Sequence, residues 1–230
     1  MLQSIKKKLK NRIRCGALRC VEIPPGMENV RASVNEVFNK VLALNPRVTS
    51  FAEHITLFNL AGITTGNIIE VGSYLCYSSA IMASAFQDNT RRLYAIDLFD
   101  RARGWSNGKS DDWIFRKFSQ REFAENFIAD CGVADRIELI QGASHDFAQG
   151  FARLDPVDMV FVDGDHTHAG CAADLADYAP YIRSGGYLAV HDYNCRLHPG
   201  VRTAVDEFLE SNTCFVSLYL VHSMLVARRS

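Results

Sequence analysis

The chain lacks the features that mark secreted, membrane-spanning and nucleic-acid-binding proteins. Its seven cysteines are an odd number and contain no CxxC pair, so neither a disulfide framework nor a cysteine zinc site is indicated. No apolar run approaches the ~20 residues of a membrane span, and the N-terminus lacks the apolar core of a secretory signal. The net charge of −1 gives no electrostatic reason to expect a nucleic-acid partner. We expect a soluble, cytoplasmic protein.

The segment Asn67–Ala83, NIIEVGSYLCYSSAIMA, is the most informative part of the sequence. In it an apolar run ends in an acid and a glycine, and a tight turn then opens a helix rich in small residues. A second acid, Asp97, closes the next apolar run about 25 positions after Gly72, where folds that bind nucleotides place a carboxylate on the ribose. The segment therefore predicts a ligand that contains a ribose.

Two common phosphate-binding patterns are missing from this segment. A dinucleotide fingerprint needs glycines two and five positions after the first, but Tyr74 and Tyr77 stand there. There is also no GxxxxGK[ST] loop to neutralise phosphate charge. A ligand with a ribose and no phosphate fits best, which favours S-adenosylmethionine.

From Asn67 onward, apolar β-rich runs alternate with helical patterns, which predicts parallel strands joined by right-handed crossovers. The last two apolar runs are too close together for a helix between them and should pair antiparallel. Strands are expected near Ile68 and Leu93 and at Ile137–Ile140, Val157–Val162, Tyr187–Val190, Cys214–Tyr219 and His222–Ala227, and helices from Ser78 and over Phe118–Ala129, Ala169–Ile182 and Val201–Leu209.

Residues 1–60 are predicted to form a helical cap on a main domain that spans residues 61–230. The first segment, MLQSIKKKLKNRIRCGALR, places apolar residues near one helical face among lysines and arginines. That pattern favours a solvated basic helix, and contact with an anionic membrane or a partner is the alternative. The sequence leaves homo-oligomerisation open.

Three segments, in order, resemble the class I S-adenosylmethionine-dependent O-methyltransferases, in particular catechol O-methyltransferase and the bacterial sugar and macrolide (macrocin-type) O-methyltransferases. EVGSYLCYSSAIMA resembles their cofactor loop, and QGASHD resembles the segment that borders the adenine. VDMVFVDGDHTH and LAVHDYN resemble the paired acidic strand ends that hold a divalent cation. The resemblance implies a Rossmann-like α/β fold with a mainly parallel seven-stranded sheet, an antiparallel C-terminal strand and helices on both faces. It implies methyl transfer to a hydroxyl of a small molecule such as a sugar or a glycosylated metabolite.

The resemblance also implies a set of cofactor-binding residues. Asp97 would accept hydrogen bonds from the ribose hydroxyls, and Gly72 would allow the cofactor to approach the backbone. Cys76 stands where related proteins usually carry glycine. The alternative for the strand-end acids is that they only cap the following helix or turn. Residues predicted beside the methionine part are Glu70, Gly72, Ser73, Tyr74, Ser78 and Asp163, and those bordering the adenine are Ala143, Ser144 and His145.

For the chemical step, the resemblance assigns Asp163 and Asp192 as oxygen ligands suited to Mg²⁺. His166 lies where related enzymes place a catalytic lysine, and its near-neutral pKa suits a general base. The third metal ligand stays open, because Tyr193 replaces a side-chain amide while Asn194 and His191 are nearby. A histidine ligand would favour a softer ion such as Mn²⁺. A metal-free mechanism with His166 or His191 as the base is the other possibility.

Two other classes of function remain compatible with the sequence. The DGDH and HDY clusters suit metal-assisted hydrolysis or hydroxylation on the same scaffold, and a non-catalytic adenosyl-binding module could act through the N-terminal basic helix. Trp105 and Trp113 lie in a polar loop that either covers the substrate or anchors to the core or to a partner.

Overall fold

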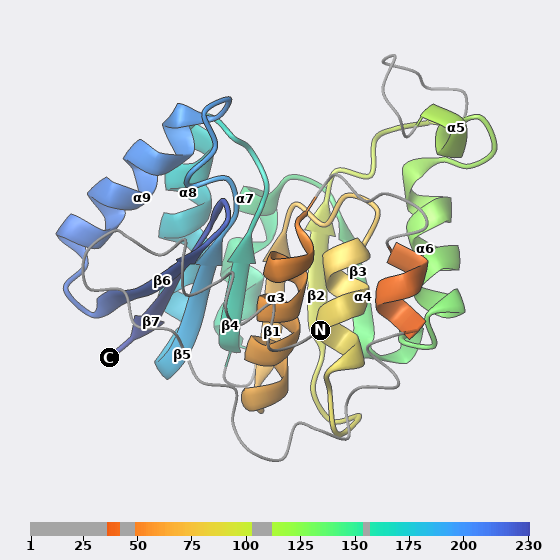
Figure 1. Ribbon diagram of the computed structural model, residues 1–230, viewed down its shortest axis with the longest axis horizontal. Helices are drawn as coiled ribbons and strands as arrows, with labels where there is room; N and C mark the ends of the chain where they lie inside the picture. Colours follow the sequence, from red (N-terminus) through yellow and green to blue (C-terminus); the bar gives the residue numbers. More distant parts are fainter. Residues whose placement is uncertain (1–35, 42–48, 103–111, 154–156) are drawn as a thin grey trace, which may run out of the picture.

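The computed structural model describes residues 36–41, 49–102, 112–153 and 157–230 (Figure 1). The predicted basic N-terminal helix and Trp105 lie outside the described residues, and so does the side chain of Trp113. Within the described part of the chain, no helix is long and apolar enough to cross a membrane.

Seven strands of the described chain form one sheet in the order β3-β2-β1-β4-β5-β7-β6. Neighbouring strands pair in parallel except β7, which is antiparallel to both β5 and β6. This arrangement confirms the predicted mainly parallel sheet with a reversed strand at the C-terminal end. The strands are β1 Asn67–Val71, β2 Leu93–Asp97, β3 Ile137–Gln141, β4 Val157–Val162, β5 Ile182–Val190, β6 Phe215–Val221 and β7 Met224–Arg229.

Helices cover both faces of the sheet (Figure 1). Residues of β1 alternate between two cores: Ile68 packs with the helices α3, α4 and α6, whereas Ile69 and Val71 pack with α8 and α9. A short helix also forms at residues 36–41. The named helices are α3 Phe51–Ile63, α4 Tyr77–Ser84, α5 Asp112–Phe115, α6 Gln120–Asp130, α7 Ser144–Phe147, α8 His168–Tyr178 and α9 Pro199–Ser211.

One predicted boundary was wrong. The helix expected over Ala169–Ile182 ends at Tyr178, a 3₁₀ turn follows, and β5 begins at Ile182 instead of Tyr187. Pro180 has no backbone N–H and stops the helix. Gly185 and Gly186 suggest a turn in the sequence, yet they lie within the strand. The predicted domain boundary after residue 60 stays a prediction; that position lies within α3, whose Leu57 and Ala61 are fully buried in the main core.

The parallel strands place the loops that follow β1, β2, β4 and β5 at one edge of the sheet, which is where open α/β sheets bind ligands. All of the predicted strand-end acids belong to this edge. Glu70 lies within β1, Asp97 ends β2, Asp163 follows β4, and Asp192 follows β5.

Candidate functional site

Glu70 lies beneath the N-terminal end of α4 and is completely buried. Its two carboxylate oxygens accept hydrogen bonds from the hydroxyls of Ser78 and Ser79. Burial raises the pKa of Glu70 to about 7, and these two hydrogen bonds only partly oppose that rise. Glu70 and Ser78 are therefore joined by a hydrogen bond. The contact of these two residues with the cofactor stays a prediction.

Gly72 lies where the loop after β1 meets the loop after β4. Its φ of +86° is a conformation that favours glycine, and a Cβ atom there would be 2.1 Å from the carbonyl oxygen of Asp163. The backbone N–H groups of Gly72 and Ser73 both donate to the carbonyl of Ile96, at 2.8 and 3.2 Å. Protein backbone thus fills the space beside Gly72 and by itself requires glycine there, and the approach of the cofactor to Gly72 stays a prediction.

Two other residues of this loop have positive φ. Tyr74 has φ +50°, and Cys76, the residue before α4, has φ +60°. Cys76 is fully buried, and this burial raises the pKa of its thiol to about 12. Glycine adopts this left-handed conformation more readily than a residue with a Cβ atom does.

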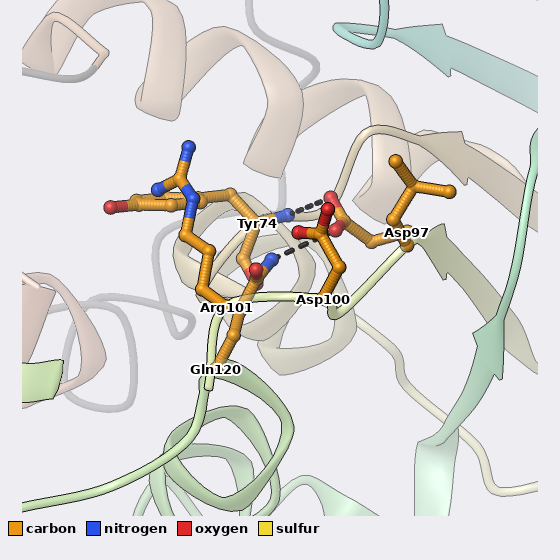
Figure 2. Close-up of a pocket in the computed structure, with 6 residues that line it drawn as sticks. Tyr74, Asp97, Asp100, Arg101 and Gln120 are labelled. Atoms are coloured by element: carbon orange, nitrogen blue, oxygen red, sulfur yellow. Dashed lines mark hydrogen bonds between the residues drawn. The ribbon is translucent and has the colours of Figure 1, made fainter. Parts of the chain in front are cut away.

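Asp97 forms the floor of a cavity of about 340 Å³ (Figure 2). Its Oδ2 accepts a hydrogen bond from the N–H of Tyr74 at 2.8 Å. Its Oδ1 accepts from the N–H of Phe99 at 3.0 Å and from Nε2 of Gln120 at 2.8 Å. Burial raises the pKa of the Asp97 carboxyl, although these hydrogen bonds oppose the rise. The cavity is lined by Tyr74, Asp97, Leu98, Asp100, Arg101 and Gln120.

Arg101 and Gln120 also line this cavity. The guanidinium carbon of Arg101 lies 4.4 Å from the centre of the Tyr74 ring, over its face (Figure 2). Gln120, which is buried at the start of α6, also donates to the carbonyl of Tyr74 at 3.1 Å. The side-chain amide of Gln120 thus forms hydrogen bonds both with the loop after β1 and with the carboxylate that ends β2.

The predicted adenine-bordering residues lie after β3. The Ser144 hydroxyl donates to Asp174 at 2.6 Å, and Nδ1 of the exposed His145 is 2.7 Å from Asp177. Both side chains therefore contact α8. Ala143 directly precedes α7 and is exposed.

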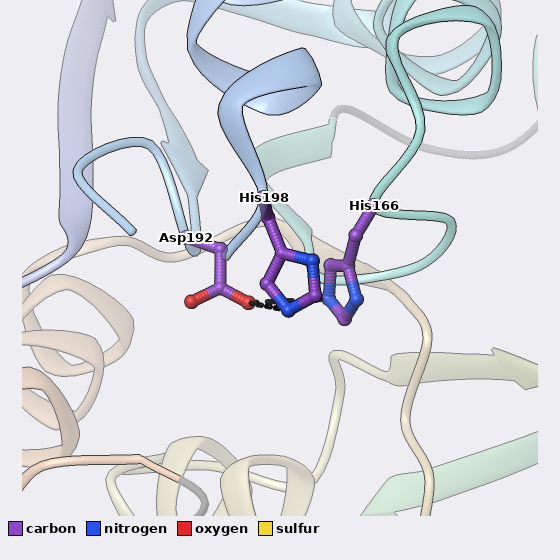
Figure 3. Close-up of side chains that lie close together, drawn as sticks. All are labelled: His166, Asp192 and His198. Atoms are coloured by element: carbon purple, nitrogen blue, oxygen red, sulfur yellow. Dashed lines mark ion pairs between the residues drawn. The ribbon is translucent and has the colours of Figure 1, made fainter. Parts of the chain in front are cut away.

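The loops after β4 and β5 bring carboxylates and histidines together. Nε2 of His166 lies 3.4 Å from Asp163 and 3.3 Å from Asp192, and Nδ1 of His191 lies 3.2 and 3.5 Å from the same two carboxylates. His198 is a further member, with its Nε2 3.9 Å from Asp192 (Figure 3). The side chains of Asp163 and Asp192 are mostly covered.

The charges in this cluster shift the pKa values of its members. The hydrogen bond to Asp163 raises the pKa of His166, although partial burial opposes the rise. Burial would raise the pKa of Asp163, but the facing His191 and His166 lower it. Burial would lower the pKa of His191, but Asp163, Asp192 and Glu53 raise it strongly. The cluster is therefore suited to holding protons or a cation between two carboxylates.

Glu53 of α3 closes the cluster from beneath. It is 1% exposed, and its Oε2 lies 3.7 Å from Nε2 of His191. Its Oε1 accepts hydrogen bonds from the N–H and the hydroxyl of Ser223 at 2.8 and 2.7 Å. A second cavity, of about 580 Å³, opens here, and its lining includes Thr49, Ser50, Glu53, His191, Asp192 and Ser223.

Sequence reasoning missed several residues of these two sites, among them Glu53, Arg101, Gln120 and His198. The capping box formed by Ser50 and Glu53 was readable as a helix start, but it explains the glutamate locally and hides its contact with His191. For Gln120 and His198, only their closeness to predicted helix starts could have drawn attention.

A pH-dependent stability is expected from the buried Glu70. Because its pKa rises from 4.5 to about 7 on folding, the folded state holds this proton more tightly. The resulting stabilisation is present below pH 4.5 and is lost as the pH rises through 7. As the pH rises from 4.5 to 7, the free energy of unfolding of the wild type should fall by about 3 kcal/mol relative to that of E70Q, which has no carboxyl group to titrate at this position. Urea unfolding across this pH range, with the exposed Glu138→Gln as control, measures the difference; parallel curves for wild type and E70Q would contradict the expectation.

The part of the chain that forms this edge matches a known protein family. Residues 69–193, more than half of the chain, match the family described as "Methyltransferase domain". The span begins in β1 and ends just after β5, so it includes Glu70, Asp97, Asp163, His166 and Asp192.

Solved structures of methyltransferases share the fold. The O-methyltransferase NovP matches with a TM-score of 0.62 at 15% identity, covering 86% of this chain and 99% of that one. An O-methyltransferase from Bacillus cereus, solved in complex with SAH (S-adenosylhomocysteine), matches with a TM-score of 0.62 at 16% identity over 100% of both chains. TomG from Streptomyces achromogenes, solved with SAM (S-adenosylmethionine), matches with a TM-score of 0.62 at 20% identity over 99% of this chain and 96% of that one.

These likenesses confirm the predicted class I methyltransferase architecture, and the match to the family covers the strand-end acids of the site. The chain belongs to the methyltransferase-domain family.

Proposed function

We propose that this protein transfers the methyl group of S-adenosylmethionine to a hydroxyl of a small molecule. One observation carries the proposal: the predicted cofactor loop packs directly on the loop that supplies the predicted base. The N–H of Asp163 donates to the carbonyl of Val71 at 2.8 Å, and Gly72 abuts the Asp163 backbone. A methyl donor bound against the β1 loop would therefore lie beside the Asp163, His166 and Asp192 cluster, as in-line transfer requires.

The cavity over Asp97 is the proposed site of the adenosine ribose. Asp97 is a half-buried carboxylate at the end of β2, and it can accept hydrogen bonds from the hydroxyls of a ribose. A ribose there would share Oδ1 with Gln120 or take its place. The adenine would then lie toward Ala143, Ser144 and His145, and the methionine part toward Glu70, Ser73, Tyr74 and Ser78. The tyrosine–arginine stack at Tyr74 and Arg101 would cover the cofactor.

His166 is the proposed proton acceptor. Its Nε2 lies between the carboxylates of Asp163 and Asp192, which stabilise the imidazolium that forms when it takes the hydroxyl proton. The side chain is 37% exposed, so an acceptor molecule can reach it. Asp163 and Asp192 orient the His166 ring, and His191 forms ion pairs with both carboxylates that offset their negative charge.

The same donor set fits a divalent cation. The ligand atoms of Asp163, His191 and Asp192 lie within 4.8 Å of one another. Asp163 and Asp192 would hold the cation with their oxygens. When bound there, a cation supplies a lower pKa for a hydroxyl placed beside it.

The cavity over Glu53 and His191 is the proposed acceptor site. Its lining includes Thr49, Ser50, Asn194 and Ser223, which offer hydroxyl and amide groups to a hydroxyl-rich acceptor such as a sugar or a glycosylated metabolite. The proposed setting is the cytoplasm, with a small-molecule substrate and no nucleic acid.

Calorimetric titration with S-adenosylhomocysteine tests the cofactor assignment. Wild-type protein should bind it saturably, and D97N should bind about 10- to 100-fold more weakly, because a hydrogen bond to a charged group is worth ~1.5–3 kcal/mol. The exposed Asp135→Asn is the matched control, and thermal melts verify that both variants fold. Equal affinity in D97N and wild type would remove Asp97 from the cofactor site, and no binding in wild type would remove the proposed function. Transfer of a labelled methyl group to a panel of hydroxylated acceptors then tests the reaction itself.

A further inference from the structure

A second group of ligand atoms lies on the outer side of the predicted catalytic cluster. His166 belongs to the loop between β4 and α8, and Asp192 follows β5 with a φ of +57°. His198 is the residue immediately before α9. Figure 3 shows the two imidazole rings side by side, with the carboxylate of Asp192 facing them. Two loops that are far apart in the sequence thus converge on one point.

The geometry brings two nitrogens to one carboxylate oxygen. Nε2 of His166 lies 3.3 Å and Nε2 of His198 lies 3.9 Å from the same Oδ2 of Asp192. The ring centres are 4.3 Å apart and the rings are tilted by 32°. The three ligand atoms all lie within 4.8 Å of one another. Ligands of a tetrahedral Zn²⁺ ion stand roughly 3.3 Å apart, given zinc–nitrogen bonds of 2.0–2.1 Å. Only His198 would have to move closer.

A shared ion suits this arrangement of two imidazoles and one carboxylate. Two protonated histidines at this distance would repel each other and compete for one oxygen, whereas two neutral histidines in the tautomer with an unprotonated Nε2 direct two lone pairs at the same space. One divalent ion accepts both lone pairs and the carboxylate charge together. The rings are also about one-third exposed, at 37% and 35%, so a fourth position stays open to solvent.

We propose that His166, Asp192 and His198 form a three-ligand site for a first-row transition-metal ion such as Zn²⁺ or Co²⁺. Two imidazoles and one carboxylate favour Co²⁺, Ni²⁺, Cu²⁺ and Zn²⁺ over Mg²⁺, which prefers oxygen ligands. This set differs from the Asp163, His191 and Asp192 set, which offers two carboxylates and one nitrogen. One consequence rests on the proposed function: an ion bound to Nε2 of His166 replaces the proton held between the two carboxylates and lowers the basicity of the ring, so it would inhibit methyl transfer.

The test uses the full-length protein, stripped of metal with a chelator and dialysed. Co²⁺ is added stepwise and followed by its visible absorption, while Zn²⁺ and Mg²⁺ are titrated by calorimetry. We expect one Co²⁺ ion to bind per chain, with the visible absorption band of a Co²⁺ site of low symmetry. Zn²⁺ should displace this ion and Mg²⁺ should not. H198Q should weaken Co²⁺ binding at least about 10-fold, because losing even an outer partner of a metal ligand costs 10- to 100-fold.

His168→Gln is the matched control, because His168 is also a surface histidine paired with a carboxylate, Glu207 at 2.8 Å, but belongs to neither ligand set. It should bind Co²⁺ as wild type does. H166Q gives a second variant of the site in case H198Q does not fold, which circular dichroism reveals. No Co²⁺ binding by wild type would overturn the proposal. So would retained binding in H198Q together with loss in D163N, because that pattern locates the ion at the other set.

S-adenosylhomocysteine binding, measured on the same samples, separates this proposal from the proposed function. Binding of S-adenosylhomocysteine without Co²⁺ would leave the methyltransferase proposal standing and remove the metal site. Binding of Co²⁺ without S-adenosylhomocysteine would do the reverse.

Discussion

Replacement of Gly72 by alanine is expected to destabilise the protein by about 4 kcal/mol or more, through two effects. The φ of +86° costs a residue with a Cβ about 1–2 kcal/mol. In addition, the new Cβ would be 2.1 Å from the Asp163 carbonyl oxygen and 2.6 Å from the Cα of Gly164, so backbone on both sides would have to move. That movement would separate the β1 loop from the β4 loop. Loss of S-adenosylhomocysteine binding is therefore expected with the loss of stability.

Gly132 provides the matched control for this experiment. It has a similar φ of +70°, but a Cβ there meets nothing within 4 Å. Gly132→Ala should therefore lose only about 1 kcal/mol, the cost of the backbone conformation. Urea unfolding of the two variants and wild type isolates the cost of the close approach. If both variants lose the same amount, the packing of Gly72 on Asp163 contributes nothing to stability.

Replacement of Glu53 by alanine is expected to lower the free energy of unfolding by about 3–5 kcal/mol, because His191 and Ser223 would lose their buried carboxylate partner. Glu53 is 1% exposed, it bonds Ser223 through both N–H and hydroxyl, and it faces His191 at 3.7 Å. The substitution should also disturb the site. Without Glu53, His191 would lose the group that orients its Nδ1 toward Asp163 and Asp192.

The pH dependence of this loss has a definite sign. Burial would raise the pKa of Glu53, but the facing His191 and the hydrogen bonds from Ser50 and Ser223 lower it well below 4.5. A lowered pKa means that the stabilisation is present above the unfolded value and is lost as the pH falls below it. The stability difference between wild type and E53A, measured by urea unfolding, should therefore be largest near neutral pH and shrink below about pH 4.

Glu122→Ala is the control for Glu53→Ala. Glu122 occupies the same capping-box position in α6, where it accepts from the N–H of Ser119 at 2.7 Å, but it is only half-buried. Loss of a cap costs about 1 kcal/mol. Similar losses for both variants would mean that Glu53 acts only as a helix cap.

Several features of the fold were predictable because they depend on local pattern. The alternation of apolar β-rich runs with helical patterns predicted every strand of the sheet, and the short gap between the last two apolar runs predicted an antiparallel pair. The carboxyl ends of neighbouring parallel strands share one edge of a sheet, so the sequence pattern alone indicates that Asp163 and Asp192 face the same crevice. The extent of β5 was missed because two glycines in its first half resemble a turn.

The neighbours of the site residues were less predictable. Ser223 lies 170 positions after Glu53, and Gln120 lies 23 positions after Asp97, so no spacing rule connects them. Ser144 and His145 were expected to face a cofactor, and their polar atoms contact Asp174 and Asp177 of α8. A short polar side chain can rotate toward either a ligand or a helix, and the sequence contains nothing that chooses between them.

By itself, the sequence determined the order of the elements, the parallel and antiparallel pairing of the strands, and the edge where the acids gather. These follow from the two-residue period of strands, the 3.6-residue period of helices and the handedness of parallel crossovers, all of which act over short stretches of chain. The tertiary structure alone decided that Glu53 meets His191, that His198 meets Asp192, and that Gly72 touches Asp163. Those contacts depend on how whole helices and loops pack at the sheet edge, which is set by the fit of many distant side chains at once.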